Sequence, residues 1–330
     1  MKERNEIVKN IFSVTTGEEF SHLAMDIFFY QARQNSIYRS YINNLGKSPD
    51  MIKEPGEIPF LPASFFKTHQ VKSGCFQSDA VFNTSGTTGN HPGRHYIRSL
   101  TLYEESLRKG FEYFYGDITD YCVIALIPES SGSLNSSLFY MATKLIKWSG
   151  NRLSGFYRDS MNRIADTIQR LKGKKEKALI FGVSYAILDY AEKFSCPSEN
   201  LIVIETGGMK GRRKELTRED LHNKIGEKLK IDNVHSEYGM TELMSQAYSK
   251  NGGRFYSPPW MRIVIRDMYD PFEYLPAGKS GAINIIDLAN IDSCSFIETS
   301  DLGKTNDDGT FEVLGRFDHS DLRGCSLLME

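Results

Sequence analysis

The sequence predicts an α/β protein built on a mostly parallel β-sheet, with a smaller antiparallel or barrel-like portion towards its end. Three continuous apolar runs, at 121–127, 178–181 and 201–204, are typical of strands buried on both faces. Helical patterns alternate with these runs, and such alternation predicts βαβ units and parallel strands. Beyond Tyr256 the pattern changes to short strands between turn signals. We expect these strands at 262–266, 281–286, 295–299 and 310–314.

The N-terminal part is predicted to be helical. Apolar residues recur at three- and four-residue steps over 20–45. Thr16 and Glu19 form a capping box at the start of this helix, and Gly46 ends it. The following segment, 58–66, is rich in proline and apolar residues, so we expect an irregular connector packed on the surface. The chain is thus divided into a helical segment with its connector (1–70), an α/β body (71–255) and a β-rich portion (256–330).

Composition gives no strong electrostatic or membrane signal. The formal net charge of the 330 residues is -2, so no basic field points to nucleic acid or to an anionic membrane. The charged start, 1–6, lacks the apolar segment of a signal peptide, and no apolar run reaches the length of a membrane span. The five cysteines show neither a CxxC pair nor zinc-site spacing. We therefore expect reduced thiols and a cytoplasmic location.

The segment 83–89, Asn-Thr-Ser-Gly-Thr-Thr-Gly, is the most informative in the chain. It follows 80–82, a short apolar run that predicts a strand. Glycines let the backbone approach a ligand closely, and successive N–H groups beside hydroxyls form a concavity that suits phosphate oxygens. No Gly-Lys-Ser/Thr follows, so this is not a Walker P-loop. Taken alone, an ordinary Ser/Thr/Gly surface turn is the commoner explanation.

Three further clusters follow at strand ends or loops, where ligands of open α/β sheets bind. The first is 205–210, Glu-Thr-Gly-Gly-Met-Lys, whose glycines allow a flat ring to lie on bare backbone. The second is 236–242, Ser-Glu-Tyr-Gly-Met-Thr-Glu, which offers an aromatic ring, a hydroxyl and a carboxylate suited to magnesium. The third combines 299–301 with 315–318. Each alone is also explained by ordinary turn chemistry, and 236–242 by a loop that opens a helix.

In this order, the four clusters resemble the adenylate-forming superfamily, whose members activate acyl and aryl acids. The resemblance narrows to the acyl-protein synthetase (LuxE-type) branch over nearly the whole chain. The segments that carry it are 28–31, 59–67, 136–141, 206–210 and 323–328. It implies the large domain of an adenylate-forming enzyme, with parallel βαβ sheets and a small barrel-like portion, lacking the usual mobile C-terminal domain.

The resemblance also implies a two-step reaction that uses ATP and Mg²⁺. ATP and a carboxylic acid of the long-chain fatty type give acyl-AMP and pyrophosphate. The acyl group then passes to Cys325, near the C-terminal end of the sequence, and on to a partner acyl reductase. A thioester-forming cysteine must present its thiolate, and Arg323 would place positive charge near it.

The resemblance further assigns the residues that meet the phosphates. The phosphate loop comprises Ser85, Gly86, Thr87, Thr88 and Gly89. Thr241 would contact the α-phosphate, and Glu242 would hold magnesium. The superfamily's catalytic lysine belongs to the missing domain, so Lys210 is the candidate replacement, although a solvated lysine in a basic patch explains it at least as well. Where the phosphate loop usually ends in Pro-Lys-Gly, this chain offers Arg94, whose guanidinium fork is not equivalent to a lysine.

The adenosine end of the nucleotide is assigned in the same way. The pair Gly207–Gly208 and the pair Tyr238–Gly239 would flank the adenine. Asp301 would accept hydrogen bonds from the ribose hydroxyls, with Arg316 nearby. Such preorganised groups stabilise the charge that develops during adenylate formation.

Two other functions stay open at this point. An acyl- or aryl-CoA ligase of the phenylacetate-CoA ligase type shares the proline-rich N-terminal segment and the Gly-Gly and Tyr-Gly signatures. A catalytically silent nucleotide-binding scaffold also fits, because the usual lysine is missing. Composition alone favours Cys325 as a small buried hydrophobe beside Leu327 and Leu328. The sequence does not identify the acid, since the aromatic residues that could line an acyl tunnel are better explained as core.

Overall fold

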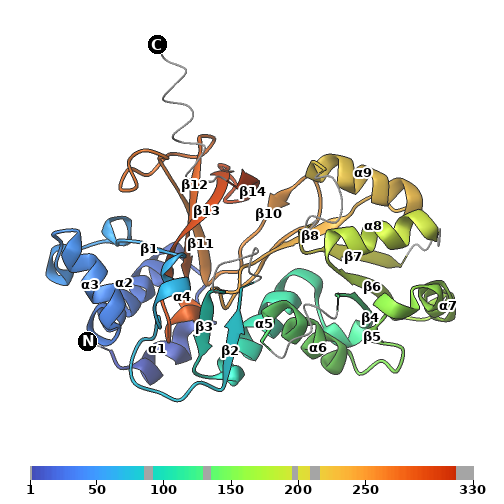
Figure 1. Ribbon diagram of the computed structural model, residues 1–330, viewed down its shortest axis with the longest axis horizontal. Coiled ribbons are helices and arrows are strands. Elements are labelled where there is room, and N and C mark those ends of the chain that lie inside the picture. The colour runs from blue at the N-terminus through green and yellow to red at the C-terminus, as the bar shows by residue number, and fades with distance from the viewer. Residues whose placement is uncertain (1, 85–91, 129–134, 195–199, 209–215, 317–330) are drawn as a thin grey trace, which may run out of the picture. The chain divides into compact units, whose positions relative to one another are not determined.

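The computed structural model describes residues 2–84, 92–128, 135–194, 200–208 and 216–316. The chain folds into two compact units (Figure 1). The first unit comprises Met1–Asp79, Gly93–Arg98 and Tyr256–Glu330, and the second comprises Ala80–Pro92 and Ser99–Phe255. The N-terminal helical segment and the β-rich portion, which are far apart in the sequence, therefore share one unit.

The second unit contains the expected parallel sheet. Its strands are β4 (Tyr121–Leu126), β5 (Gly155–Phe156), β6 (Lys177–Gly182), β7 (Leu201–Glu205), β8 (His235–Tyr238) and β9 (Ala247–Ser249). They lie in the order β5-β4-β6-β7-β8-β9, and every neighbouring pair is parallel except β8 with β9. The three apolar runs of the sequence correspond to β4, β6 and β7, which confirms them as strands of a parallel sheet. Two shorter strands of this unit are β2 (Ala80–Asn83) and β10 (Arg254–Phe255).

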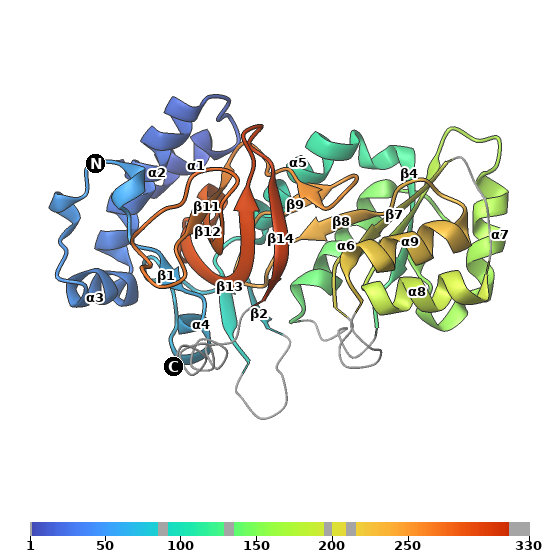
Figure 2. The ribbon, with the colours of Figure 1, turned by 90° about the horizontal axis from the view of Figure 1, so that it is seen from above.

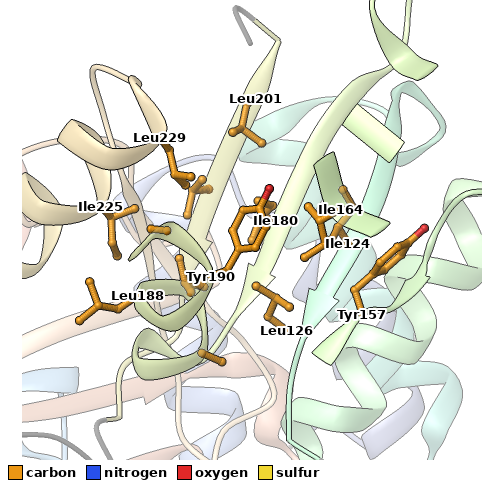
Figure 3. Packing of buried hydrophobic residues seen from close by; sticks show 14 of the residues in the cluster. Ile124, Leu126, Tyr157, Ile164, Ile180, Leu188, Tyr190, Leu201, Ile225 and Leu229 are labelled. Carbon is orange, nitrogen blue, oxygen red and sulfur yellow. The ribbon is translucent and has the colours of Figure 1, made fainter. Parts of the chain in front are cut away.

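Helices cover both faces of the parallel sheet. They are α5 (Leu100–Tyr115), α6 (Ser137–Ser149), α7 (Asn162–Leu171), α8 (Ser184–Lys193) and α9 (Arg218–Leu229). On one face, Ile124 and Ile180 pack with Leu188 of α8 and Ile225 of α9 (Figure 3). Alternate strand residues point to the opposite face, where the core includes residues of α5 and α6. Burial on both faces explains why the strands are continuous apolar runs.

The first unit contains the expected antiparallel portion. Its strands are β1 (Leu61–Pro62), β3 (Arg94–Ile97), β11 (Met261–Arg266), β12 (Ser280–Asp287), β13 (Phe296–Thr305) and β14 (Phe311–Arg316). Strands β11, β12, β13 and β14 pair in sequence order, each antiparallel to the next. The register shifts between Ala282 and Asn284 and between Leu302 and Gly303, and such bulges bend the strands. Figure 2 shows the resulting curled sheet.

The predicted N-terminal helix is two helices rather than one. The predicted region corresponds to α2 (Gly17–Gln34) and α3 (Ser36–Asn44), which are separated by a break at Asn35. A further short helix, α1 (Arg4–Ile11), precedes them. The Asn35 side chain accepts a hydrogen bond from the Tyr38 N–H at 3.0 Å and donates to the Ser293 carbonyl at 3.0 Å. An asparagine that caps a new helix in this way competes with continuation of the old one. The capping box of Thr16 and Glu19 is confirmed.

The expectation of an irregular connector at 58–66 is wrong. Leu61–Pro62 forms β1, which runs parallel to β13 with Leu61 opposite Ile297, and helix α4 (Phe65–Thr68) follows directly. A proline is tolerated there because it occupies the edge of a sheet, where no N–H is needed on the outer side. Within the described ranges, no helix combines the length and the apolar character needed to cross a membrane.

The close approach of β4 and β6 leads to a stability prediction. A Cβ atom at Gly182 would lie 2.3 Å from the Leu126 carbonyl oxygen, and this backbone atom cannot swing aside. We expect Gly182→Ala to destabilise the protein by about 1–3 kcal/mol in urea unfolding, as overpacked cores do. Gly155→Ala in β5 is the control, since its nearest new contact is an ordinary 3.7 Å to the Tyr157 ring. Equal unfolding midpoints for the two variants would contradict this prediction.

Candidate active site

The ends of the parallel strands bring two of the sequence clusters to one edge of the sheet. Gly182 of β6 is the register partner of Glu205 of β7, and Glu205 is the partner of Ser236 of β8. Chain segments that leave β7 and β8 beyond this row therefore begin side by side. They are Gly207–Gly208 after β7 and 239–242 after β8. Ligands of open α/β sheets bind outside this carboxyl edge, so it is the candidate active site of the second unit.

Several predicted site residues lie outside the described ranges. They are Ser85, Gly86, Thr87, Thr88, Gly89, Lys210 and Cys325. The described chain reaches Thr84 just after β2, and Gly208 just before the segment with Lys210. The roles assigned to these residues therefore stay predictions.

The two glycines after β7 present bare backbone. Gly207 has φ +74° and Gly208 has φ +88°, a left-handed conformation that side-chain-bearing residues rarely adopt. Apart from its two chain neighbours, no described residue has an atom within 4 Å of the position that a Cβ of Gly207 would take. The hydroxyl oxygen of the preceding residue, Thr206, is buried and has no hydrogen-bond partner among the described residues. An open backbone surface beside an unsatisfied hydroxyl suits a flat ring that carries hydrogen-bonding groups.

A buried carboxylate lies directly beneath this loop. One oxygen of Glu205, Oε2, accepts from the Ser184 hydroxyl at 2.6 Å and from the Gly207 N–H at 2.7 Å. The other oxygen, Oε1, accepts from the Ser236 hydroxyl at 2.5 Å. His222 of α9 completes the set, with Nε2 3.5 Å from Oε1 and 3.2 Å from the Ser236 hydroxyl oxygen. The donors come from four different segments of the second unit.

These contacts keep Glu205 ionised. Burial alone would raise its pKa, but hydrogen bonds from His222, Ser184 and Ser236 outweigh this effect and lower the pKa to about 2. An unfolded glutamate titrates near pH 4.3, so Glu205 contributes stability above about pH 4.3 that is lost as the pH falls towards 2.

The segment after β8 is a tight turn rather than the start of a helix. The Leu243 N–H donates to the Met240 carbonyl at 3.1 Å, and the turn contains Thr241 and Glu242. Glu242 is buried. A Cβ at Gly239 would lie 2.5 Å from Glu237 Oε1, so a side chain there would require the Glu237 carboxyl to move. The turn thus places a hydroxyl and a carboxylate at the sheet edge.

Tyr238 ends β8 as a largely buried ring. Its ring centroid lies 5.9 Å from that of Phe255 at an interplanar angle of 64°. The guanidinium of Arg218 in turn stacks over Phe255, with its central carbon 4.9 Å from that centroid. This packing restricts the orientation of the Tyr238 ring, and its place beside the adenine stays a prediction.

Glu237 differs sharply from Glu205 in its protonation. It points to the opposite face from Ser236, and burial together with the charge of Glu205 raises its pKa to about 8. The neighbouring groups include His235, whose pKa is lowered to about 4, chiefly by burial. Tyr115 of α5 bonds the His235 ring at 3.1 Å, and burial raises the pKa of this tyrosine. The sheet edge therefore holds one charged and one mainly neutral glutamate at neutral pH.

Asp301 and Arg316 lie together on the curled sheet of the first unit. They are register partners on β13 and β14, and Arg316 Nε lies 3.8 Å from Asp301 Oδ1. The Asp301 N–H donates to the Thr299 hydroxyl at 3.1 Å, and that hydroxyl donates to the Ile283 carbonyl at 2.8 Å. Arg316 was expected near Asp301, and the strand pairing brings them together.

Sequence reasoning missed the set of residues around Glu205. Ser184 and His222 were not singled out, and Glu205 and Ser236 were noted only as the first residues of their clusters. One signal was available: Glu205 is a carboxylate at the last position of an otherwise apolar buried strand. Such a group needs buried donors, because an unpaired charge is too costly to remove from water.

Comparison with known proteins identifies the family. Residues 17–330 match the family described as acyl-protein synthetase, LuxE. The chain belongs to this family. No curated protein matches the chain. The membership confirms the resemblance seen in the sequence.

Solved structures show the same fold at low sequence identity. ATP-bound MatB from Rhodopseudomonas palustris matches with a TM-score of 0.56 and 17% identity, over 75% of this chain and 49% of that one. A 2-hydroxyisobutyryl-CoA ligase in an open conformation, bound to 2-HIB-AMP and CoA, matches with a TM-score of 0.67 and 14% identity, over 93% and 72%. The LuxE-family chain thus spans about half the length of MatB. The predicted α/β fold of an adenylate-forming enzyme is confirmed.

The raised pKa of Glu237 gives a prediction with a definite sign. Between about pH 4.3 and 8 the folded protein keeps a proton that the unfolded chain releases, so stability falls as pH rises across this window. Glu237→Gln removes this dependence. We therefore expect the difference in melting temperature, variant minus parent, to become more positive from pH 5 to pH 9. Glu227→Gln, on the exposed face of α9, is the control, and a pH-independent difference for Glu237→Gln would refute the assignment.

Proposed function

We propose that this protein activates a carboxylic acid, of the long-chain fatty type, with ATP and then carries the acyl group on Cys325. The observation that carries the proposal is the match to the acyl-protein synthetase family over residues 17–330. In the first step a carboxylate oxygen of the acid attacks the α-phosphorus, and pyrophosphate leaves. In the second step the Cys325 thiolate attacks the acyl carbonyl, and AMP leaves as the thioester forms. A partner reductase in the cytoplasm then receives the acyl group.

The described residues support binding of the nucleotide at the two predicted places. The bare backbone of Gly207–Gly208 and the packed ring of Tyr238 are suited to the two faces of the adenine. Asp301 lies on β13 with Oδ1 3.8 Å from Nε of the mostly exposed Arg316, and its carboxylate would accept from the ribose hydroxyls. Thr241 would donate to the α-phosphate, while the loop 85–89 would cradle the outer phosphates. Each group would act as a fixed donor or acceptor when charge develops in the transition state.

The residues also fit a magnesium ion held mainly by the nucleotide. Within the described ranges, no three His, Cys, Asp or Glu side chains gather as a metal site would require. Magnesium at such enzymes is bound by one or two carboxylates together with substrate phosphates, so a single carboxylate, Glu242, meets the requirement. When bound, the ion would neutralise charge on the phosphates. Lys210 would supply a further positive charge at the α-phosphate.

A second candidate function is an acyl- or aryl-CoA ligase of the phenylacetate-CoA ligase type. One observation favours it, since the structural neighbour with the TM-score of 0.67 was solved with CoA. Dependence of product formation on CoA distinguishes this reaction from self-acylation. A silent nucleotide-binding scaffold, the third possibility, is excluded if a carboxylic acid supports exchange of pyrophosphate into ATP.

We expect ATP binding to depend on Asp301 and on Glu242. Asp301→Ala removes charge-assisted hydrogen bonds to the ribose, a loss of roughly 1.5–3 kcal/mol each. Glu242→Ala removes an oxygen ligand for magnesium, so its effect should appear only when magnesium is present. Titration calorimetry with ATP measures both. Glu312→Ala on β14, whose carboxylate pairs with Lys304 at 3.2 Å, is the control. Unchanged ATP affinity in both site variants would show that the assignment is wrong.

Intact-protein mass spectrometry tests the acyl acceptor. After incubation with ATP, magnesium and a panel of acids, we expect the parent to gain one acyl mass that hydroxylamine removes. Cys325→Ser should lose this adduct but keep acid-dependent pyrophosphate exchange, because adenylation precedes the thiol step. Cys75→Ser is the control, since Cys75 is an exposed free cysteine that would reveal nonspecific acylation. A labile adduct that persists in Cys325→Ser would place the acceptor elsewhere.

A further inference from the structure

One buried carboxylate joins the two segments that were assigned to the adenine. Glu205 Oε2 accepts from the N–H of Gly207, and Oε1 accepts from the hydroxyl of Ser236, two residues before Tyr238. We propose that Glu205 is a positioning residue, which sets the distance between the Gly207–Gly208 backbone and the Tyr238 ring so that the base fits between them. This rests on the proposed function, because the nucleotide site is part of it.

Both backbone polar groups of Gly207 are hydrogen-bonded, one to Glu205 and the other to Ser184. The Gly207 N–H donates to Glu205 Oε2 at 2.7 Å, while the Gly207 carbonyl accepts from the N–H of Ser184 at 3.3 Å. The Ser184 hydroxyl donates to the same Oε2 atom at 2.6 Å, so Ser184 and Glu205 hold the Gly207 residue together. A glycine with φ +74° has many alternative conformations, and these contacts select one of them.

The same carboxylate fixes strand β8 where its pairing with β7 is short. Only two Cα pairs are registered between these strands, Ile204 with His235 and Glu205 with Ser236. The Ser236–Glu205 hydrogen bond therefore adds a side-chain tie at the last registered pair. Ser236 and Tyr238 are two residues apart on a strand and share one face. A shift of β8 at Ser236 would consequently move the Tyr238 ring as well.

Glu205 is not placed to act on the substrate itself. Its side chain is buried, and its oxygens are occupied by Ser184, Ser236 and the Gly207 N–H, with His222 alongside. Its ionised state is held by these neighbours rather than by a ligand. An effect of Glu205 on the reaction must therefore act through the loop and through β8.

Glu205→Gln tests the proposal, because it keeps the shape but points an amide N–H₂ towards hydrogen-bond donors. We expect a roughly tenfold rise in the KM for ATP in pyrophosphate exchange, with kcat changed much less, since misplacing a binding group by about 1 Å costs up to ~10²-fold. A residue that only supported the fold would lower the melting temperature and leave the KM at a permissive temperature unchanged. An unchanged KM for ATP would overturn the proposal.

Two further variants keep the test informative if Glu205→Gln folds poorly. Ser236→Ala retains the carboxylate and removes its hydrogen bond to β8, together with the contact of the hydroxyl with His222, so it should also raise the KM for ATP. Its matched control is Ser249→Ala, because Ser249 is the register partner of Ser236 on β9 and its hydroxyl donates to the Asn251 carbonyl instead. Equal KM values for Ser236→Ala and Ser249→Ala would count against the proposal.

A last comparison separates this proposal from the proposed function. Asp292 of the first unit is also a buried carboxylate, which accepts from Arg4 and Arg98 and, among the residues that the structure describes, has no hydrogen bond to a predicted site residue. Asp292→Asn should lower stability without raising the KM for ATP. If the parent neither binds ATP in calorimetry nor exchanges pyrophosphate, the proposed function fails. If the parent does both and Glu205→Gln matches Asp292→Asn in KM, only the positioning role fails.

Discussion

A buried carboxylate can exist at the end of β7 only because four neighbouring segments turn donors towards it. Removing an ionised carboxylate from water is costly, and the cost is met here by two hydroxyls, a backbone N–H and an imidazole. Those donors belong to the start of α8, the loop after β7, strand β8 and helix α9. The need to satisfy Glu205 therefore restricts where all four segments can lie. The geometry of the sheet edge follows from this restriction.

The first unit uses a buried charge in a comparable way. Arg266 donates to the carbonyls of Ile283 and Thr299 at 3.2 and 3.0 Å, and to Asn284 Oδ1 at 2.8 Å. Ile283 and Asn284 lie on β12 at the register shift, and Thr299 lies on β13 two residues before Asp301. A bulge interrupts the regular hydrogen bonding between neighbouring strands. A buried guanidinium that donates to nearby carbonyl oxygens can stabilise the backbone there. In each unit a buried, hydrogen-bonded charged side chain, Glu205 or Arg266, thus stabilises a segment that carries predicted site residues.

The sequence predicts elements better than it predicts the partners of single polar residues. Strands β4, β6 and β7 were evident because burial on both faces demands continuous apolar runs. The break at Asn35 was not evident, since apolar residues recur at helical spacing on both sides of it and the hydrogen bond from its amide to Ser293 joins residues far apart in the sequence. Apart from the Gly207 N–H, the partners of Glu205 lie 17 to 31 residues away, and the packing of α8, β8 and α9 brings them together. The role of Cys325 follows only from the family resemblance, which also strengthens the phosphate-loop interpretation, and both assignments stay predictions.

The two glutamates at the sheet edge show how one site limits its own negative charge. Glu205 and Glu237 lie on adjacent strands and face opposite sides, and the charge of Glu205 contributes to the raised pKa of Glu237. Glu205 has donors enough to stay ionised, whereas no hydrogen bond links the Glu237 carboxyl to another described residue. The proton therefore remains on Glu237 at neutral pH. A site proposed to accept both a triphosphate and a carboxylate gains from this arrangement, because a second fixed negative charge would repel each of them.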